Sequence, residues 1–552
     1  MDKVVWNLKR FKTVLVLGFI TFPILLHLLS YTETLLFLFF LISSKDFMEN
    51  IRILSQIQRE IRCPKNHSFE YGKNIPSLST TTIANDKLLD GLLVSSFGDE
   101  ASCLSRYQSY LYRKASPRKP SKYLISKLRN YEHLHRSCVL NTESYNKIMR
   151  KDAKFSKIDA SSRCKYIVWT ASNGLGNRML TLAAAFLYAI LTDRVHLVEF
   201  RADMIGLFCE PFPDSSWLLP RNFPYWKDQK HIETYENMLK NNKENSSHEV
   251  LPQFLILNLQ HTHDGRTNLF HCDRSQDLLQ KIPVLILLSD QYFVPSLFMI
   301  PSFRQDLRKM FPDIDTVFHH LGRYLFHPSN EAWELIRNYY NANLAEAKER
   351  IGLQIRVFNT HKGSHDTIIS EIIACTLQHK LLPELDMQKS ATSPLTKPTS
   401  KVVLVASLYS EYGEKLRTMY QANTTMTREV IRVYQPTHEE RQKSNDGMHN
   451  IKAWTEIYLL SLCDALVTSS KSTFGYIAHS LGGLKPWILQ RTYGETIPDP
   501  PCQRAKSMEP CFHYPPKYDC RANSTVDFTS IFDHMKHCED VSHGLRLVNA
   551  NP

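Results

Sequence analysis

The stretch Tyr166–Phe200, YIVWTASNGLGNRMLTLAAAFLYAILTDRVHLVEF, decides the fold. An apolar run of strand length (166–170) leads into a glycine-rich turn (171–177), then a helical run rich in alanine and leucine, and then a second apolar run, Val195–Phe200. A strand, a glycine turn, a helix and another strand in this order predict a crossover between parallel strands. The stretch therefore predicts an α/β protein.

A second series of the same kind begins after Arg350. We expect its strands in five apolar segments separated by helical or loop stretches: Ile351–Phe358, Val402–Leu408, Val430–Tyr434, Ala465–Thr468 and Trp487–Gln490. Two separated series predict two Rossmann-like, doubly wound lobes that face a cleft, residues 86–345 and 346–552. The segment Leu381–Lys401 is rich in Ser, Thr and Pro and is predicted to be an exposed loop of the second lobe.

Length and composition limit the class of protein. The chain has 552 residues, which is too long for one ordinary domain. Its 43% hydrophobic and 22% charged residues are typical of a globular protein and exclude a wholly disordered, collagen-like or polytopic membrane protein. The net charge of +12 favours phosphate-bearing partners. The basic residues are spread too evenly to predict a nucleic-acid partner.

The amino-terminal region predicts a membrane anchor. Residues 13–42 contain no Lys, Arg or Asp and are mainly apolar. A hydrocarbon core of about 30 Å needs about 20 helical residues, so this segment can span it. Basic residues precede it, which predicts a cytosolic tail (1–12), a signal anchor (13–42), a stem (43–85) and a lumenal body. A buried core helix is the alternative interpretation of residues 13–42.

Cysteines and glycosylation sequons agree with a lumenal body. The chain has 12 cysteines at wide, irregular spacings without a Cys-X-X-Cys pair, which favours disulfides over zinc. Four Asn-X-Ser/Thr sequons predict N-glycosylation at Asn66, Asn245, Asn423 and Asn523.

The glycine turn predicts an anion site. Its last residues stand where a helix begins: Gly174, Gly176, Asn177 and Arg178. Glycines permit a tight turn, and free amides at a helix start favour phosphate or a phosphorylated sugar. A dinucleotide site is an alternative because Glu199 ends the next strand, although Met179 replaces the third glycine of that motif. A turn that only packs the helix on the strand is the other alternative.

Two further strand ends carry groups that bind anions. Arg356 lies in the otherwise apolar strand predicted at 351–358, near its carboxyl end, where its guanidinium can contact phosphate in a bidentate manner. An exposed or edge-strand arginine is the alternative. The segment Thr468–Gly475, TSSKSTFG, places five hydroxyl groups before a helix. A simple helix cap explains one hydroxyl but not five, so we predict a second anion cradle there.

Asp290 follows the apolar run 284–288 at another strand end. Its carboxylate is predicted to be a general base or an acceptor for sugar hydroxyls, with a solvated turn residue as the alternative. Asp313 and Asp315 form an Asp-X-Asp pair, which binds a metal in one class of transferases, but their place before a helical stretch favours capping.

Four further residues suggest a metal cluster but lack its usual spacing. They are interpreted as loop residues: His261, His263, His271 and Cys272.

Several long motifs closely resemble the plant xyloglucan fucosyltransferase family of galactoside α-1,2-fucosyltransferases. They are SNGLGNRML (172–180), SDQYFVPSLF (289–298), IGLQIRVF (351–358), HNIKAWTEIYLLSLCDALVTSS (449–470), STFGYIAHSLGGLKPWIL (472–489) and EPCFHYPPKYDC (509–520). The resemblance extends from about Asp86 to the carboxyl-terminal region. It implies a GT-B fold of two lobes, a type II Golgi membrane protein and GDP-L-fucose as donor substrate.

The resemblance also implies roles for individual residues. Arg356 contacts the donor diphosphate, and Asp290 engages the acceptor. The remaining donor-binding residues are Gly174, Gly176, Asn177, Arg178, Ser472, Thr473 and Phe474. The chain departs from the family at Lys471, where a bulky apolar residue or Ala is usual. This lysine either alters the donor pocket or faces solvent.

The implied reaction is an inverting transfer of L-fucose to O2 of a galactose without a metal cofactor. Xyloglucan side chains in the plant cell wall are the expected acceptor. Two alternatives stay open: transfer to arabinogalactan protein glycans, and a non-catalytic glycan-binding protein on the same fold. The sequence leaves the oligomeric state open, with a homodimer as one alternative.

Overall fold

The structure is a computed structural model, which describes residues 87–549 except for 96, 139–141, 144, 147–163, 221–222, 224–231, 245–250, 262–268, 358–364, 391–399, 444, 491–495 and 521–523. The described residues belong to one compact unit, Leu78–Pro552. The predicted tail, anchor and stem lie outside the described residues, as do the predicted glycosylation sites Asn66, Asn245 and Asn523. Within the described ranges, no helix is both long and apolar enough to cross a membrane.

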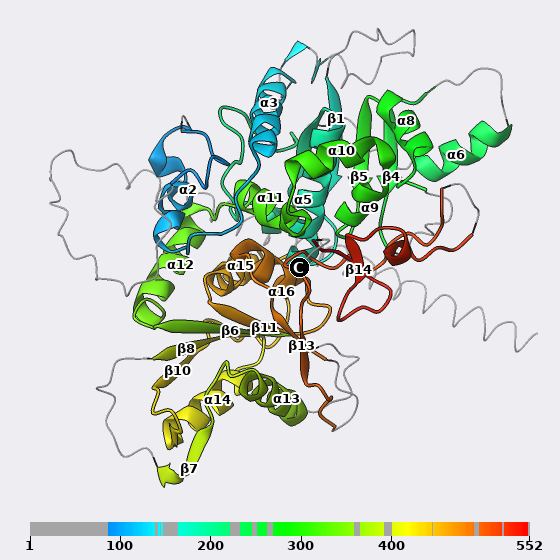
Figure 1. The fold of residues 1–552 in the computed structure, drawn as a ribbon. Coiled ribbons are helices and arrows are strands. Elements are labelled where there is room, and N and C mark those ends of the chain that lie inside the picture. Colours follow the sequence, from blue (N-terminus) through cyan, green and yellow to red (C-terminus); the bar gives the residue numbers. More distant parts are fainter. Residues whose placement is uncertain are drawn as a thin grey trace, which may run out of the picture. The chain divides into compact units, whose positions relative to one another are not determined.

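The first sheet is built around the stretch that follows Cys164. Its five strands are all parallel and lie in the order β2-β1-β5-β4-β3, of which β1, β5 and β4 are labelled in Figure 1. The strands are β1 (Lys165–Thr170), β2 (Arg194–Glu199), β3 (Glu233–Thr234), β4 (Phe254–Asn258) and β5 (Val284–Leu288). The predicted strands at 166–170 and 195–200 agree with β1 and β2 to within one residue, whereas β3 and β4 were not predicted.

The second sheet follows from the second series. Its order is β10-β8-β6-β11-β12-β13, with only β13 antiparallel to its neighbour. The strands are β6 (Glu349–Ile355), β8 (Lys401–Ser407), β10 (Ile431–Tyr434), β11 (Ala465–Thr468), β12 (Trp487–Leu489) and β13 (Cys502–Arg504). All five predicted strands are confirmed. Several boundaries differ by one to three residues, and β6 in particular ends at Ile355, which leaves Arg356 just beyond the strand.

Helices surround both sheets. The α-helices are α2 (Leu104–Gln108), α3 (Lys122–Cys138), α5 (Leu175–Leu191), α6 (Tyr235–Glu244), α8 (Asp273–Lys281), α9 (Val294–Met299), α10 (Pro301–Met310), α11 (Val317–Leu325), α12 (Asn330–Asn343), α13 (His365–Gln378), α14 (Glu411–Ala422), α15 (Gly447–Ser461) and α16 (Thr473–Gly482). The 3₁₀-helices are η1 (Glu100–Ser102), η2 (Ser109–Leu111), η3 (Ala202–Met204), η5 (Ile314–Thr316) and η6 (Phe528–Ser530).

The main hydrophobic core lies where helices of the two sheets meet. Helix α16 packs on both α5 and α15, and α11 packs on α5 and α16 (Figure 1). Nearly every residue of α5 is buried. One cluster contains Trp169 of β1, Trp454 of α15 and Leu404 of β8, so the apolar contact is continuous from one sheet to the other. This contact holds the carboxyl ends of the central strands of the two sheets near each other.

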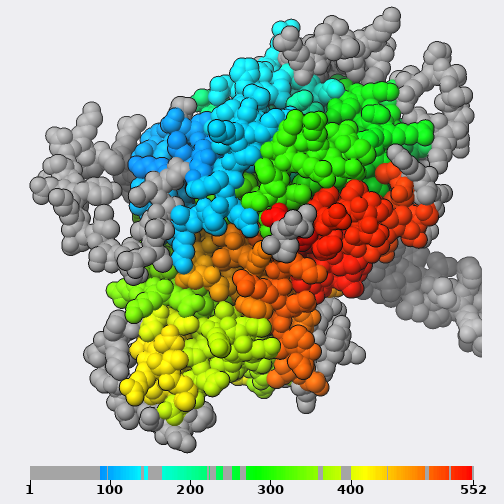
Figure 2. Space-filling view, viewed as in Figure 1, coloured from blue at the N-terminus to red at the C-terminus, as the bar shows by residue number. Residues whose placement is uncertain are grey.

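The carboxyl-terminal segment returns to the first sheet. Its hairpin of β14 (Met535–His537) and β15 (Leu545–Leu547) contacts α9, and in Figure 2 the segment, in red, lies against residues in green. Disulfides fasten it: Cys511–Cys538 closes it on itself and Cys272–Cys520 joins it to the start of α8. The other disulfides are Cys103–Cys209, Cys138–Cys164 and Cys375–Cys502. The prediction of disulfides is confirmed.

The prediction that 381–401 is a loop throughout is wrong. Part of it forms β7 (Leu385–Ser390), which pairs antiparallel with β9 (Asn423–Thr425). The Ser, Thr and Pro content of the surrounding segment obscured this short strand, which depends on a partner from a distant part of the chain.

Candidate active site

The glycine turn between β1 and α5 lies where it was predicted, but its glycines do not supply the left-handed backbone conformation of the turn. The left-handed backbone conformation belongs to Asn173, with a φ of 58°, while Gly174 has a φ of −75°. Gly176 is needed for a close approach, because a Cβ there would lie 2.5 Å from Thr473 Oγ1 and 3.0 Å from the Phe474 nitrogen. The amino-terminal ends of α5 and α16 therefore meet at Gly176.

A side-chain hydrogen bond joins the same two helix ends. Thr473 Oγ1 donates to Asn177 Oδ1 at 3.0 Å. Ser472 is the N-cap of α16, and its hydroxyl accepts from the Gly475 amide at 3.4 Å. Each helix start carries about half a positive charge. Both ends therefore favour an anion placed between them.

A cavity of about 370 Å³ lies at this junction and is lined from both sheets. Most of the predicted donor-binding residues line it: Gly174, Gly176, Asn177, Arg356, Ser472, Thr473 and Phe474. We call it the donor cavity. Residues that follow strands of both sheets thus line one cavity, as expected for strand ends that face a cleft.

Arg356 reaches the donor cavity from the end of β6. Its backbone amide donates to Ser469 Oγ at 2.9 Å, which ties the end of β6 to the end of the adjacent β11. Its Nη2 donates to Gln442 Oε1 at 2.8 Å. The side chain is half-buried, and this burial lowers the pKa of the guanidinium from its ordinary value. An arginine remains charged after such a shift, so it can pair with phosphate.

Among the predicted donor-binding residues, Arg178 is the one that does not line the donor cavity. Its side chain is buried, with Nη1 2.7 Å from Asp203 Oδ2 and Nε donating to the Asn173 carbonyl at 2.8 Å. It lines an adjoining cavity of about 320 Å³ that shares Gly174 and Gln442 with the donor cavity. In this structure Arg178 fastens the glycine turn to η3.

Helix α15 supplies cavity residues that were not predicted. His449, Lys452 and Glu456 all line the donor cavity. Their spacing of three and four residues places them on one helix face. The motif HNIKAWTEIYLL shows this row of polar residues in an otherwise apolar helix, and this pattern could have indicated them as site residues.

The acidic groups of the cavity wall carry little uncompensated charge. Burial raises the pKa of Glu456 to about 8, while Thr437 donates hydrogen bonds to its carboxyl group. Glu439 pairs with Lys452, which lowers the pKa of Glu439. Burial lowers the pKa of His513, another cavity residue, to about 4.

Asp290 lies beside the donor cavity, beyond the glycine turn. Its backbone carbonyl accepts from Asn177 Nδ2 at 3.0 Å, and its Oδ2 accepts from Asn173 Nδ2 at 3.0 Å. Its Oδ1 accepts from the His261 amide at 3.0 Å, and its Oδ2 bonds His261 Nδ1. The alternative interpretation of Asp290 as a solvated turn residue is thus wrong, because its side chain is only 2% exposed.

His261 is the exposed partner of this carboxylate and was not predicted as a site residue. Its side chain is 40% exposed, and its ring stacks on Tyr514 with centroids 5.1 Å apart. Tyr514 is itself exposed and follows His513 of the donor cavity. His261 and Tyr514 therefore present polar and aromatic surface next to Asp290.

The other candidate residues have separate partners. His271 bonds the Tyr518 carbonyl and Cys272 is in a disulfide, while His263 lies outside the described residues. Neither Asp313 nor Asp315 is among the donor-cavity residues.

The Asp-X-Asp pair also does not cap a helix as predicted. Asp313, at the start of η5, makes no side-chain capping bond and pairs with Arg118 at 3.0 Å. Asp315 is buried and accepts from Asn549 Nδ2 at 2.9 Å. Ion pairing and tertiary contacts thus replaced the local cap.

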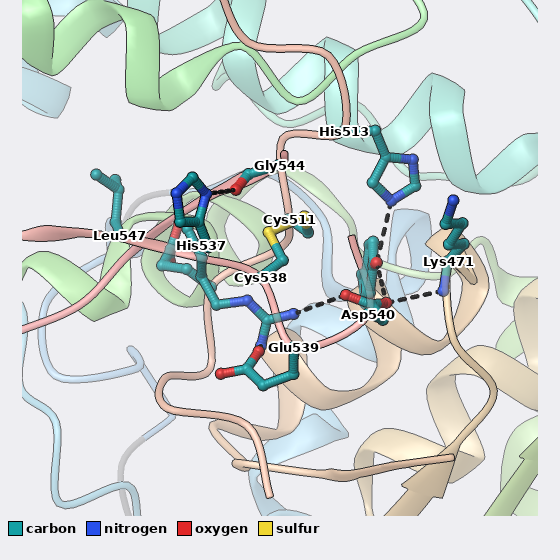
Figure 3. The surroundings of a disulfide bond; sticks show 12 residues. Lys471, Cys511, His513, His537, Cys538, Glu539, Asp540, Gly544 and Leu547 are labelled. Carbon is teal, nitrogen blue, oxygen red and sulfur yellow. Dashed lines mark hydrogen bonds and ion pairs between the residues drawn. A yellow bond between two sulfur atoms is a disulfide. The ribbon is translucent and has the colours of Figure 1, made fainter. Parts of the chain in front are cut away.

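Figure 3 shows how the carboxyl-terminal segment supports the cavity wall. Asp540 Oδ2 accepts from the Lys471 amide at 2.7 Å and also bonds the Tyr476 hydroxyl. The same hydroxyl lies 3.0 Å from His513 Nε2. The Cys511–Cys538 disulfide closes the segment that carries His513, and Cys538 lies two residues before Asp540.

Comparisons with known proteins identify relatives of high similarity. The model of the family described as xyloglucan fucosyltransferase matches residues 66–521. A galactoside 2-alpha-L-fucosyltransferase of Pisum sativum is 50% identical over 483 residues, which cover 87% of this chain and 85% of that protein. A protein of the same name from Arabidopsis thaliana is 51% identical over 475 residues, covering 85% and 84%.

A solved structure agrees with these matches. The structure of a mutant of Arabidopsis thaliana FUT1 in complex with GDP is similar with a TM-score of 0.77 and 51% identity. The match covers 84% of this chain and 100% of that chain.

Proposed function

Because the chain belongs to the xyloglucan fucosyltransferase family, we propose that it is an inverting fucosyltransferase that moves L-fucose from GDP-L-fucose to O2 of a galactose. The acceptor in this proposal is a plant cell-wall glycan, with xyloglucan side chains first. One observation carries the proposal: Arg356 and the amino-terminal ends of α5 and α16 line a single cavity.

The donor cavity suits a nucleoside diphosphate leaving group. When the bond between fucose and the diphosphate breaks, negative charge grows on the departing GDP. Arg356 and the helix-start amides lie in place before the reaction, so they stabilise this charge without reorganising. The guanidinium fork matches two phosphate oxygens at once. In this proposal the chain's own groups stabilise the leaving group, and no metal is required.

The acceptor side of the proposal uses Asp290 and His261. In an inverting transfer, the acceptor hydroxyl forms its bond to the fucose anomeric carbon on the face opposite to the breaking bond, and it loses its proton. Asp290 is buried, so it acts on the acceptor through the exposed His261, whose ring it orients. His261 Nε2 then accepts the hydroxyl hydrogen bond and helps to remove the proton. Exposed Tyr514 offers a stacking surface for a sugar ring.

A transfer assay with the purified chain tests the proposal. GDP-L-fucose is combined with galactosylated xyloglucan fragments, with the same fragments after galactosidase treatment, and with arabinogalactan acceptors. We expect an α-linked fucose at galactose O2 on the intact fragments only. Transfer to the arabinogalactan acceptors alone would replace xyloglucan with arabinogalactan as the proposed acceptor. If the chain bound the glycan but showed no fucose transfer and no donor hydrolysis, the result would favour the non-catalytic alternative.

We also propose a type II Golgi protein with a cytosolic tail (1–12), a signal anchor (13–42), a stem (43–85) and lobes 86–345 and 346–552. Disulfides among the described residues support a lumenal location for the body, since they persist in oxidising compartments. Asn66, Asn245, Asn423 and Asn523 are the proposed glycosylation sites. Protease protection in sealed microsomes, read together with a glycosidase mobility shift, tests this topology.

A further inference from the structure

His513 lies where the donor cavity meets the surface proposed for the acceptor. It lines the donor cavity together with Lys471, and the two side chains lie side by side in Figure 3. The next residue, Tyr514, stacks on His261, the exposed partner of Asp290. One short segment therefore borders both the cavity for the leaving group and the acceptor surface.

A buried chain of hydrogen bonds fixes one ring nitrogen of His513. Asp540 Oδ2 accepts from the Tyr476 hydroxyl, and the Asp540 side chain is fully buried with Arg546 3.9 Å from its Oδ1. The tyrosine gives its single hydroxyl hydrogen to this carboxylate, so its oxygen can only accept a further bond. His513 Nε2 lies 3.0 Å away and is therefore the nitrogen that carries a hydrogen and donates it.

The other ring nitrogen of His513 is an acceptor that is open to the cavity. Burial lowers the pKa of His513 to about 4, so at neutral pH the imidazole is neutral and only one nitrogen carries a hydrogen. Among the described residues, Nδ1 has no hydrogen-bond partner, and it is not one of the buried side-chain atoms that lack one. In Figure 3 this nitrogen points away from Asp540. It offers a lone pair to a ligand in the cavity.

The part of the ligand that suits this nitrogen is the sugar. In an inverting transfer, the transferred sugar lies between the departing diphosphate and the acceptor hydroxyl. Ser472 and Thr473 at the start of α16 line the cavity and favour the diphosphate, and Tyr476 lies one turn further along the same helix. A sugar ring offers hydroxyl hydrogens, whereas the phosphates of a nucleotide sugar offer none. A neutral acceptor at this point therefore fits the sugar and not the phosphates.

We propose that His513 Nδ1 accepts a hydrogen bond from a hydroxyl group on the ring of the transferred sugar, and so helps to select that sugar in the donor. This inference rests on the proposed function and assigns a specificity residue within its site. Because the contact is made to the sugar alone, it contributes to the affinity for GDP-fucose and not to the affinity for GDP.

Two substitutions separate the two nitrogens of His513. An asparagine side chain carries its amide atoms near the position of Nδ1, whereas a glutamine side chain carries them near the position of Nε2. His513→Asn therefore keeps an acceptor toward the cavity. His513→Gln keeps the contact to Tyr476 and loses that acceptor.

Calorimetric titration of the full chain with GDP and with GDP-fucose, without an acceptor, measures the contact. We expect His513→Gln to raise the Kd for GDP-fucose by about fivefold, the range for a neutral hydrogen bond, and to leave the Kd for GDP within about twofold of the wild type. His513→Asn should keep most of the affinity for GDP-fucose. His133→Gln, at an exposed position of α3, is the matched control and should bind both ligands as the wild type does.

The tautomer of His513 gives a second readout, which does not depend on affinity. Nuclear magnetic resonance of the full chain with isotope-labelled histidine should show a hydrogen on Nε2 and none on Nδ1. The His513 signals are identified by their loss in His513→Gln. A hydrogen on Nδ1 would overturn the inference.

The binding data separate this inference from the proposed function. A His513→Gln chain that binds GDP-fucose as tightly as the wild type would overturn the inference alone. Equal weakening of GDP and GDP-fucose would do the same, because a displaced cavity wall would explain both, and so would equal losses in the Gln and Asn variants. A wild-type chain that binds neither ligand would overturn the proposed function, and the inference with it.

Discussion

His261 and Asp290 form one hydrogen-bonded unit in which the histidine is exposed and the carboxylate is hidden. The Asp290 side chain is 2% exposed and the His261 side chain is 40% exposed. Asp290 accepts from both the backbone amide and the ring of His261. In the proposed mechanism a substrate therefore meets the imidazole first, and the carboxylate acts through it.

We expect His261→Ala and Asp290→Asn each to lower kcat by about 10²-fold, the range for general acid–base groups, with little change in the KM for GDP-fucose. Because the two residues act as a unit, the double variant should lose little more activity than either single variant. Steady-state kinetics with varied donor and acceptor measure this. The exposed His133→Ala on α3 is the control. Full acceptor turnover by Asp290→Asn would remove the pair from the mechanism.

Tyr514 should determine how the acceptor binds. The residue is 52% exposed, and its ring stacks on His261. We expect Tyr514→Ala to raise the acceptor KM by about tenfold, while Tyr514→Phe keeps most of the affinity because the stacking face remains. Kinetics with xyloglucan fragments at saturating donor measure the difference. Equal acceptor KM values in all three chains would exclude a stacking role.

Arg356→Lys keeps the positive charge but loses the planar fork. We expect transfer at subsaturating GDP-fucose to fall by about tenfold or more, because a bidentate charged contact becomes a single one. Arg136→Lys is the control, since Arg136 is 49% exposed and lies 3.9 Å from Asp214 on the surface. Transfer by Arg356→Lys within about twofold of the wild type would contradict the assigned role.

Gly176→Ala should separate the two helix ends at the donor cavity. The new Cβ would lie 2.5 Å from Thr473 Oγ1 and 3.0 Å from backbone atoms of α16, so the helices must shift. We expect a loss of about 1–3 kcal/mol in the free energy of unfolding and weaker GDP binding. Gly447→Ala is the control, because its nearest neighbour would be 3.9 Å away. Denaturant unfolding and calorimetry measure both effects. Unchanged stability would show that the contact relaxes without cost.

Glu456 should make stability depend on pH. Burial raises its folded-state pKa from 4.5 to about 8, so the protonated carboxyl is favoured in the folded protein. Its contribution is therefore fully present below about pH 4.5 and is lost as the pH rises through about 8. Glu456→Gln should flatten the decline of stability between these values, although Glu509 and Glu371, also raised to about 8, preserve part of it.

Urea unfolding at several pH values measures this slope. Glu334→Gln changes an exposed carboxylate of α12 and is the control. A Glu456→Gln chain with the slope of the wild type would show that another group carries the dependence.

Most of the donor-binding residues that local patterns in the sequence predicted line the donor cavity, with Arg178 as the exception. The glycine turn, the arginine in an otherwise apolar segment and the row of hydroxyl groups before a helix are local patterns, and each was recognised without tertiary information. Parallel strands direct their carboxyl ends to one edge, so these patterns were expected to face a common cleft. The predicted family is confirmed, because long motifs carry that information in their residues.

Only the tertiary structure decided the acceptor side and the cavity wall. His261 follows β4 and Asp290 follows β5, and these strands pair with Asn258 opposite Leu288. Because β4 was not recognised, the histidine looked like a loop residue. The partners of the cysteines and the hydrogen bond from the Lys471 amide to Asp540 depend on contacts between distant segments. Local patterns in a sequence specify strand ends and helix starts, but which side chains share one cavity is set by how the two sheets pack.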